Sequence, residues 1–148
     1  MYNNFGQFID GKWQQSEKKE TYDVINPATE EIIGSASKAS SIEVQKALKS
    51  AEKGLKVWSN TTPWQRSYVL RKIADLMREK KDVLAKWLTL EVGKPLTEGV
   101  GEVEGAADIF EWNAEETKRI YGQTVQSRFP ETRIHVYYQP VGVVAALI

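Results

Sequence analysis

The chain contains no cysteine and only one histidine among its 148 residues. The absence of cysteine excludes disulfides, thiolate metal sites and cysteine nucleophiles within this sequence. The single histidine, His135, excludes a multi-histidine metal site. No carboxylate or nucleophile is tied to His135 by spacing, so we expect an exposed strand residue rather than a catalytic base. The sequence therefore offers no catalytic residue and no metal site.

A surplus of charge of one sign is also missing, because 20 basic residues balance 20 acidic ones. A neutral chain has no basic excess for nucleic acid or for an anionic membrane surface. No apolar run reaches the length of a membrane span, and the N-terminal residues lack the basic and apolar regions of a signal peptide. We therefore expect no nucleic-acid partner, no membrane partner and a cytoplasmic location.

Short strands are predicted for the first forty residues. Residues 8–13 contain Asp10-Gly11 between apolar neighbours, which is typical of a tight hairpin turn. The residues from Thr21 to Ile25 predict another strand, and residues 31–36 predict a strand that pairs back after the turn at 26–29.

Four helices are predicted in the middle of the chain. Ser40 and Glu43 form a capping box at the start of the first helix, and Thr62-Pro63 begins the second. The third helix covers roughly residues 82–92 and ends at a glycine cap. The fourth is predicted from Leu96 to Tyr121, with Gly122 at its end. The second helix is expected to bury an apolar stripe formed by Val69, Leu70, Ile73, Leu76 and Met77.

The fourth helix carries a second stripe beside its apolar face, at three- or four-residue spacing: Gly101, Gly105, Asp108 and Trp112. Each interior glycine costs a helix about 1 kcal/mol relative to alanine, so these glycines call for a reason. One interpretation is close packing of another backbone, and the other is the wall of a ligand tunnel. Glycine serves both uses, so both remain open. Among the many carboxylates here, Glu102 adjoins the stripe.

The C-terminal residues predict two strands of different kinds. Residues from Thr132 to Gln139 alternate between apolar and polar side chains, which is typical of a half-exposed strand. Residues from Val141 to Ile148 form a continuous apolar run, which is typical of a strand buried on both faces of a parallel sheet. Such a strand needs parallel neighbours and covering helices.

Five motifs in order resemble the N-terminal part of the NAD(P)-dependent aldehyde dehydrogenase superfamily over nearly the whole chain. They lie at residues 8–13, 25–29, 64–66, 91–96 and 139–143. Residues 109–122 look most like succinate-semialdehyde dehydrogenases. The resemblance implies an α/β fold with small strands, a four-helix layer, the start of an oligomerisation strand and the first strand of a Rossmann-like cofactor sheet. It divides the chain into a part of the cofactor-binding domain (1–122), an oligomerisation element (123–139) and the truncated first strand of the cofactor sheet (140–148).

The same resemblance implies a function for the intact protein. It would oxidise an aldehyde, succinate semialdehyde in particular, to the acid with NAD or NADP, as a homo-oligomer joined through the strand near Thr132 to Gln139. The family's cysteine, glutamate and asparagine lie beyond residue 148 in its order, so the chain alone is expected to be inactive and to bind no cofactor well. The resemblance places the carbonyl of Ile148 near the nicotinamide ribose and Gly105 in the substrate tunnel.

Two other hypotheses remain beside the dehydrogenase. The chain could be a gene remnant or a module that joins full-length subunits through its exposed strand. It could also be a free-standing helical binding domain without any link to dehydrogenation, which would cover its own terminal strand.

Overall fold

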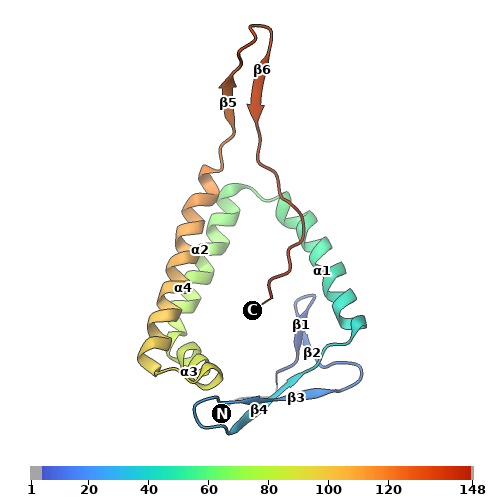
Figure 1. Cartoon of the computed structure of the whole chain (residues 1–148), viewed down its shortest axis with the longest axis vertical. Helices are drawn as coiled ribbons and strands as arrows, with labels where there is room; N and C mark the ends of the chain where they lie inside the picture. Colours follow the sequence, from blue (N-terminus) through green and yellow to red (C-terminus); the bar gives the residue numbers. More distant parts are fainter. Residues whose placement is uncertain (1–4, 148) are drawn as a thin grey trace.

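A computed structural model of the chain describes residues 5–147. The strands in this part are β1 (Gln7–Ile9), β2 (Lys12–Gln14), β3 (Thr21–Ile25), β4 (Ile32–Ser37), β5 (Gln123–Gln126) and β6 (Arg133–Val136). The helices are α1 (Ser41–Ser59), α2 (Pro63–Glu79), α3 (Lys81–Val92), α4 (Leu96–Glu116) and the 3₁₀ helix η1 (Thr117–Arg119). They form an open frame in which α2 and α4 run side by side, α1 lies apart from them, and β5 and β6 project beyond the helices (Figure 1).

The first hairpin has the turn that the sequence predicts. β1 and β2 pair antiparallel, with Ile9 opposite Lys12. Asp10 and Gly11 between them have φ of 54° and 75°. Positive φ at both central residues is the requirement of the type I′ turn, whose twist matches that of the flanking strands.

The second pair of strands also confirms the prediction. β3 and β4 pair antiparallel, with Thr21 opposite Ser37 and an irregularity between Val24 and Ile25. The turn that joins them begins at the buried Asn26, whose Oδ1 accepts a hydrogen bond from the N–H of Ala28 at 2.9 Å. An asparagine side chain that bonds the backbone two residues ahead forms a local turn without outside help.

The start of α1 is fastened by one buried carboxylate. Glu43 is 2% exposed, and its Oε2 accepts from the N–H of Ser40 at 2.7 Å, which completes the predicted capping box. Its Oε1 accepts from the N–H of Glu17 at 3.0 Å, in the loop between β2 and β3. Hydrogen bonds from Ser40 and from the Glu17 backbone lower the pKa of Glu43 to about 2. Glu43 therefore caps a helix and holds a distant loop against it.

The tightest packing lies among α2, α3 and α4, where the buried side chains are small: Ser67, Ala74, Ala85, Val103, Ala107 and Ala114. Small side chains let helix backbones approach closely. The predicted burial of Val69 and Leu76 is wrong, because both are 39% exposed. Leu70, Ile73 and Met77 are half-buried. In the described part of the chain α2 packs mainly against α4, which leaves Val69 and Leu76 uncovered.

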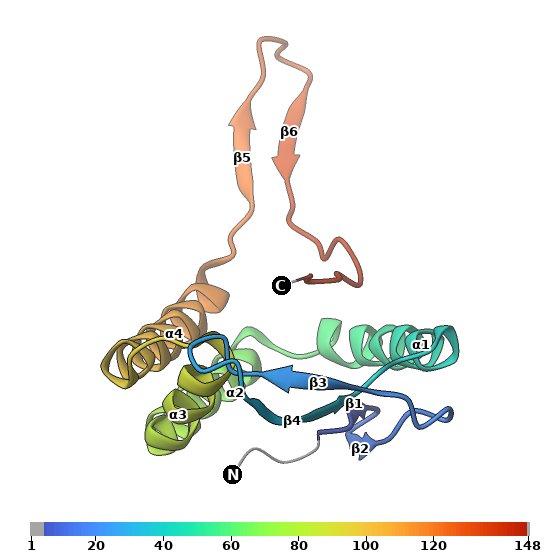
Figure 2. The same ribbon diagram turned by 60° about the horizontal axis from the view of Figure 1, so that its bottom comes forward.

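The exposed area is large for the size of the protein. The accessible surface is 11687 Å² for a mass of 16.8 kDa. A compact monomer of that mass exposes roughly 7,700 Å², so roughly 4,000 Å² is in excess. The turned view explains the excess, because α1 lies near β1 on one side while α2–α4 and the β5–β6 hairpin extend away from it (Figure 2).

The fourth helix ends earlier than predicted. α4 stops at Glu116 and tightens into η1, instead of continuing to Tyr121. At this point the buried Thr117 accepts a hydrogen bond through its Oγ1 from Nε of Arg66 on α2, at 3.2 Å. Gly122 is not the helix cap that we expected. A side chain there would run into the backbone oxygen of Val136, so Gly122 allows β6 to approach.

The C-terminal part differs from the sequence expectation in two ways. The strand expected from Thr132 to Gln139 is shorter, and it pairs with β5, which the sequence did not reveal. Residues 141–147 are not a strand in the isolated chain, and Val141 and Leu147 are 94% and 95% exposed. A buried parallel strand needs strands on either side, and no described residue of this chain pairs with the segment.

Candidate functional site

The stripe on α4 faces open space. A Cβ added at Gly101 or Gly105 would meet no atom within 4 Å in residues 5–147, and Trp112 is 70% exposed. The close-packing interpretation therefore has no partner for these two glycines within the described residues. The tunnel interpretation stays a prediction, and the open space beside Gly101 and Gly105 is compatible with it.

Close packing occurs instead at Gly99, two residues before Gly101 and on another face of the helix. A Cβ there would lie 3.0 Å from the backbone oxygen of Ala85 and 3.2 Å from Oγ1 of Thr89, both on α3. Gly99 is buried, whereas Gly101 is exposed. The glycines of α4 thus divide into one that lets α3 approach and two that leave a surface bare.

Asp108, the only charged member of the stripe, is held by Arg78 from α2. Nη2 of Arg78 donates to Oδ1 of Asp108 at 2.7 Å and to Oε2 of Glu111 at 2.7 Å. Asp108 and then Glu111 raise the pKa of Arg78 above its usual value. Arg78 is consequently a fixed positive charge beside the stripe.

α4 carries a high negative charge, and basic residues outside this helix compensate it. Its sequence has no basic residue and seven carboxylates: Glu98, Glu102, Glu104, Asp108, Glu111, Glu115 and Glu116. In the described structure, six basic residues from other elements form ion pairs with them: Arg71, Arg78, Lys81, Lys94, Lys118 and Arg119. Six of these seven carboxylates, all but Glu98, are therefore ion-paired in the described structure. Glu102, which adjoins the stripe, pairs with Lys94.

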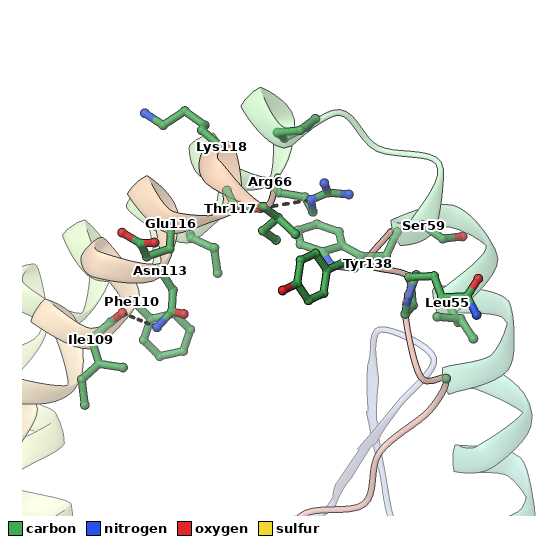
Figure 3. A pocket seen from close by; sticks show the side chains of 17 residues that line it. Leu55, Ser59, Arg66, Ile109, Phe110, Asn113, Glu116, Thr117, Lys118 and Tyr138 are labelled. Atoms are coloured by element: carbon green, nitrogen blue, oxygen red, sulfur yellow. Dashed lines mark hydrogen bonds between the residues drawn. The ribbon is translucent and has the colours of Figure 1, made fainter. Parts of the chain in front are cut away.

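Sequence reasoning missed a hollow at the junction of α1 and α2. It has a volume of about 1040 Å³ and lies between the end of α1, the start of α2, the end of α4 and residues 138–142. Figure 3 shows Arg66 bonded to Thr117 at its wall, and Tyr138 between Thr117 and Ser59. Arg66 also donates through Nη1 to the carbonyl of Thr61 at 3.0 Å. The bond to Thr117 holds α2 to the end of α4, and the bond to Thr61 holds it to the loop that follows α1. No sequence pattern signals a hollow formed by segments so far apart.

The remaining candidate residues belong neither to the stripe on α4 nor to the hollow. His135 is exposed on β6, with Nδ1 3.2 Å from Oγ1 of Thr124 on β5. Within residues 5–147 no group of three His, Asp or Glu side chains could hold a metal ion. No helix in that range is long and apolar enough to cross a membrane. Ile148, the expected cofactor contact, lies outside the described residues.

Two motifs that are far apart in the sequence meet in space. Gly93 follows α3 with φ of 75°, and a Cβ there would lie 2.9 Å from Cγ of Pro27 and 3.0 Å from the backbone nitrogen of Ala28. Only glycine fits a left-handed position so close to another backbone. The motif at 91–96 is therefore packed against the turn at 25–29, as parts of one architecture.

The model of the Aldehyde dehydrogenase family matches residues 13–148, and the chain belongs to this family. It is 45% identical over 140 residues to the glutarate-semialdehyde dehydrogenase of Pseudomonas aeruginosa, covering 95% of this chain and 29% of that protein. It is 42% identical over 139 residues to the succinate-semialdehyde dehydrogenase of Escherichia coli strain K12, whose name specifies NADP(+), covering 94% of this chain and 29% of that protein.

A solved structure agrees with this assignment. The succinate-semialdehyde dehydrogenase from Burkholderia pseudomallei superposes with a TM-score of 0.86 at 37% identity, covering 94% of this chain and 29% of that one. The fold expectation is thereby confirmed as the N-terminal part of an aldehyde dehydrogenase fold. The chain spans less than a third of the length of the relatives that it matches. Family membership does not favour a helical binding domain without any link to dehydrogenation.

Proposed function

We propose that this chain supplies the N-terminal part of an NAD(P)-dependent aldehyde dehydrogenase that oxidises a carboxylate-bearing semialdehyde, succinate semialdehyde in particular, to the acid. The observation that carries the proposal is the similarity to semialdehyde dehydrogenases over 94–95% of the chain. The chain by itself has no cysteine for attack on the aldehyde, so we expect it to be inactive alone.

The exposed faces of the chain support an assignment of its three segments to different parts of a larger enzyme. We propose that residues 1–122 belong to the cofactor-binding domain, 123–139 to an oligomerisation element and 140–148 to the first strand of the cofactor sheet. The excess surface of roughly 4,000 Å² is more than a monomer leaves bare, and the apolar run at 141–147 is exposed. The projecting β5–β6 hairpin supports a contact between subunits through Thr132 to Gln139.

The substrate path is proposed to run along the stripe of α4. Gly101 and Gly105 remove bulk, Trp112 offers an exposed aromatic face, and Asp108 carries a charge that Arg78 pairs. A nicotinamide cofactor would accept hydride from the aldehyde carbon elsewhere in the enzyme. Its proposed contact with this chain is the carbonyl of Ile148.

A hybrid enzyme tests the proposal. In this hybrid, the chain replaces the matching N-terminal part of the Escherichia coli relative, and NADPH formation is followed with succinate semialdehyde. We expect the hybrid to reduce NADP(+), and the 148-residue chain alone to produce nothing. A well-folded hybrid that leaves NADP(+) unreduced with every aldehyde, while the parent relative is active, would refute the proposal. It would then favour the alternative of a remnant or strand-mediated module, which co-elution of the chain with the parent relative would support.

A further inference from the structure

The stripe on α4 contains a charge conflict with its proposed substrate. A semialdehyde of a dicarboxylic acid carries a carboxylate, and Asp108 carries another on the surface along which that substrate is proposed to pass. Two like charges repel strongly when water is excluded between them. The inference below rests on the proposed function, since it concerns the same substrate path.

The structure assigns Arg78 as the residue that resolves this conflict. We propose that Arg78 is a positioning residue that neutralises Asp108, so that the wall formed by α4 accepts aldehydes with a carboxylate. Its Nη2 lies 2.7 Å from Oδ1 of Asp108, and it is anchored from the other side by Oε2 of Glu111 at 2.7 Å. The guanidinium keeps its charge at every physiological pH, so the neutralisation is permanent.

The other basic residues around α4 do not serve this purpose. Helical geometry places Asp108 at the edge of the arc formed by Gly101, Gly105 and Trp112. On the same side, Glu115, Glu104 and Glu111 lie progressively further round the helix, toward α2 and α3. Lys81 pairs with Glu104, and Arg71 pairs with Glu111 and Glu115. Among the described ion pairs of α4, only that of Arg78 reaches a stripe residue.

The expected effect depends on substrate charge and not on substrate size. An unpaired Asp108 about 7 Å from a substrate carboxylate, at an effective dielectric constant of about 40, would weaken binding about tenfold. A neutral aldehyde of the same length would be unaffected. We therefore expect a change in KM for one substrate class alone, with kcat changed by less than about twofold, because the interaction concerns substrate binding rather than the transition state.

The test uses the hybrid enzyme with two aldehydes of equal carbon number, succinate semialdehyde and butanal. Arg78→Gln removes the charge and keeps a hydrogen-bonding side chain. We expect it to raise KM for succinate semialdehyde about tenfold and to leave KM for butanal within about twofold. Adding Asp108→Asn should restore KM for succinate semialdehyde, because the unpaired carboxylate is then gone.

Arg71→Gln is the matched control. It removes an equivalent charge from the same face of α2, but its partners Glu111 and Glu115 lie off the stripe. We expect it to leave the ratio of the two KM values unchanged. The inference is overturned if Arg78→Gln raises both KM values equally, if Arg71→Gln reproduces its effect, or if Asp108→Asn fails to restore binding. Inactivity of the unmutated hybrid with both aldehydes would instead be a failure of the proposed function, and would remove this inference with it.

Discussion

Alanine substitution of the three glycines of α4 should separate close packing from open surface. Gly99, Gly101 and Gly105 occupy the same helix, so the intrinsic gain in helix stability from glycine to alanine is similar at each site, about 1 kcal/mol. What differs is the space that each new methyl group enters. At Gly101 and Gly105 no atom of residues 5–147 lies within 4 Å, so the whole gain should be observed.

At Gly99 the same change places Cβ 3.0 Å from the backbone oxygen of Ala85 and 3.2 Å from Oγ1 of Thr89. Both contacts are tighter than ordinary van der Waals separation, so α3 must shift. Overpacking of a tight contact costs about 1–3 kcal/mol, which offsets or exceeds the helix gain. Gly99→Ala should therefore leave the chain equally stable or less stable, while Gly101→Ala and Gly105→Ala each stabilise it.

Thermal unfolding of the 148-residue chain, followed by far-UV circular dichroism at low concentration, measures the difference. A gain of about 1 kcal/mol raises Tm by about 3 °C in a domain of this size. We expect that rise for Gly101→Ala and Gly105→Ala, and no rise or a fall for Gly99→Ala. Equal stabilisation at all three positions would show that α3 does not approach α4 at Gly99. A loss of stability at Gly105 would show that the stripe is covered within this chain.

Three further predictions concern the stripe, the buried carboxylate and the terminal segment. In the hybrid enzyme, Gly105→Leu should raise KM for succinate semialdehyde and butanal alike, because bulk obstructs both; equal KM values before and after the change would contradict a substrate path along α4. Glu43 has a pKa of about 2 in the folded chain against 4.5 as its ordinary value, so the stability that it adds is complete above pH 4.5 and is lost as the pH falls toward 2. Urea midpoints should therefore fall over that range in the unmutated chain and fall less in Glu43→Gln; parallel profiles would contradict this role. Deletion of residues 141–148 should reduce light scattering by the isolated chain, because it removes an exposed apolar run; unchanged scattering would disprove it.

Features that depend on neighbouring residues in the sequence could be predicted well. The turn at Asp10-Gly11 and the capping box at Ser40 and Glu43 both appear as expected. In each case the groups that satisfy the backbone lie within four residues, so the sequence contains the whole interaction. The second role of Glu43, which binds the Glu17 backbone 26 residues away, could not be read from spacing.

Features that depend on distant partners were predicted less well. The burial of Val69 and Leu76 was inferred from helical periodicity, which shows that a face is apolar but not that anything covers it. The early end of α4 involves the hydrogen bond between Arg66 and Thr117, 51 positions apart. Pairing of β5 with β6 was missed because the segment 123–126 alternates weakly and its side chains are exposed.

The candidate site shows the same division. Spacing correctly grouped Gly101, Gly105, Asp108 and Trp112 on one face of α4, since the helical period alone decides that. Spacing could not tell that Gly101 and Gly105 face open space, nor that Arg78 holds Asp108 from another helix. The neutralising partner of a charge on a helix is a property of tertiary packing.

The most direct test of the account is complementation in two pieces. The 148-residue chain is co-expressed with the remainder of the Escherichia coli relative, from which the part that this chain matches has been removed. We predict that NADPH forms with succinate semialdehyde only when both pieces are present, and that the chain co-purifies with the remainder. Activity of the remainder that is the same with and without the chain, or no activity from a complex that assembles, would contradict the claim that this chain supplies the N-terminal part of an aldehyde dehydrogenase.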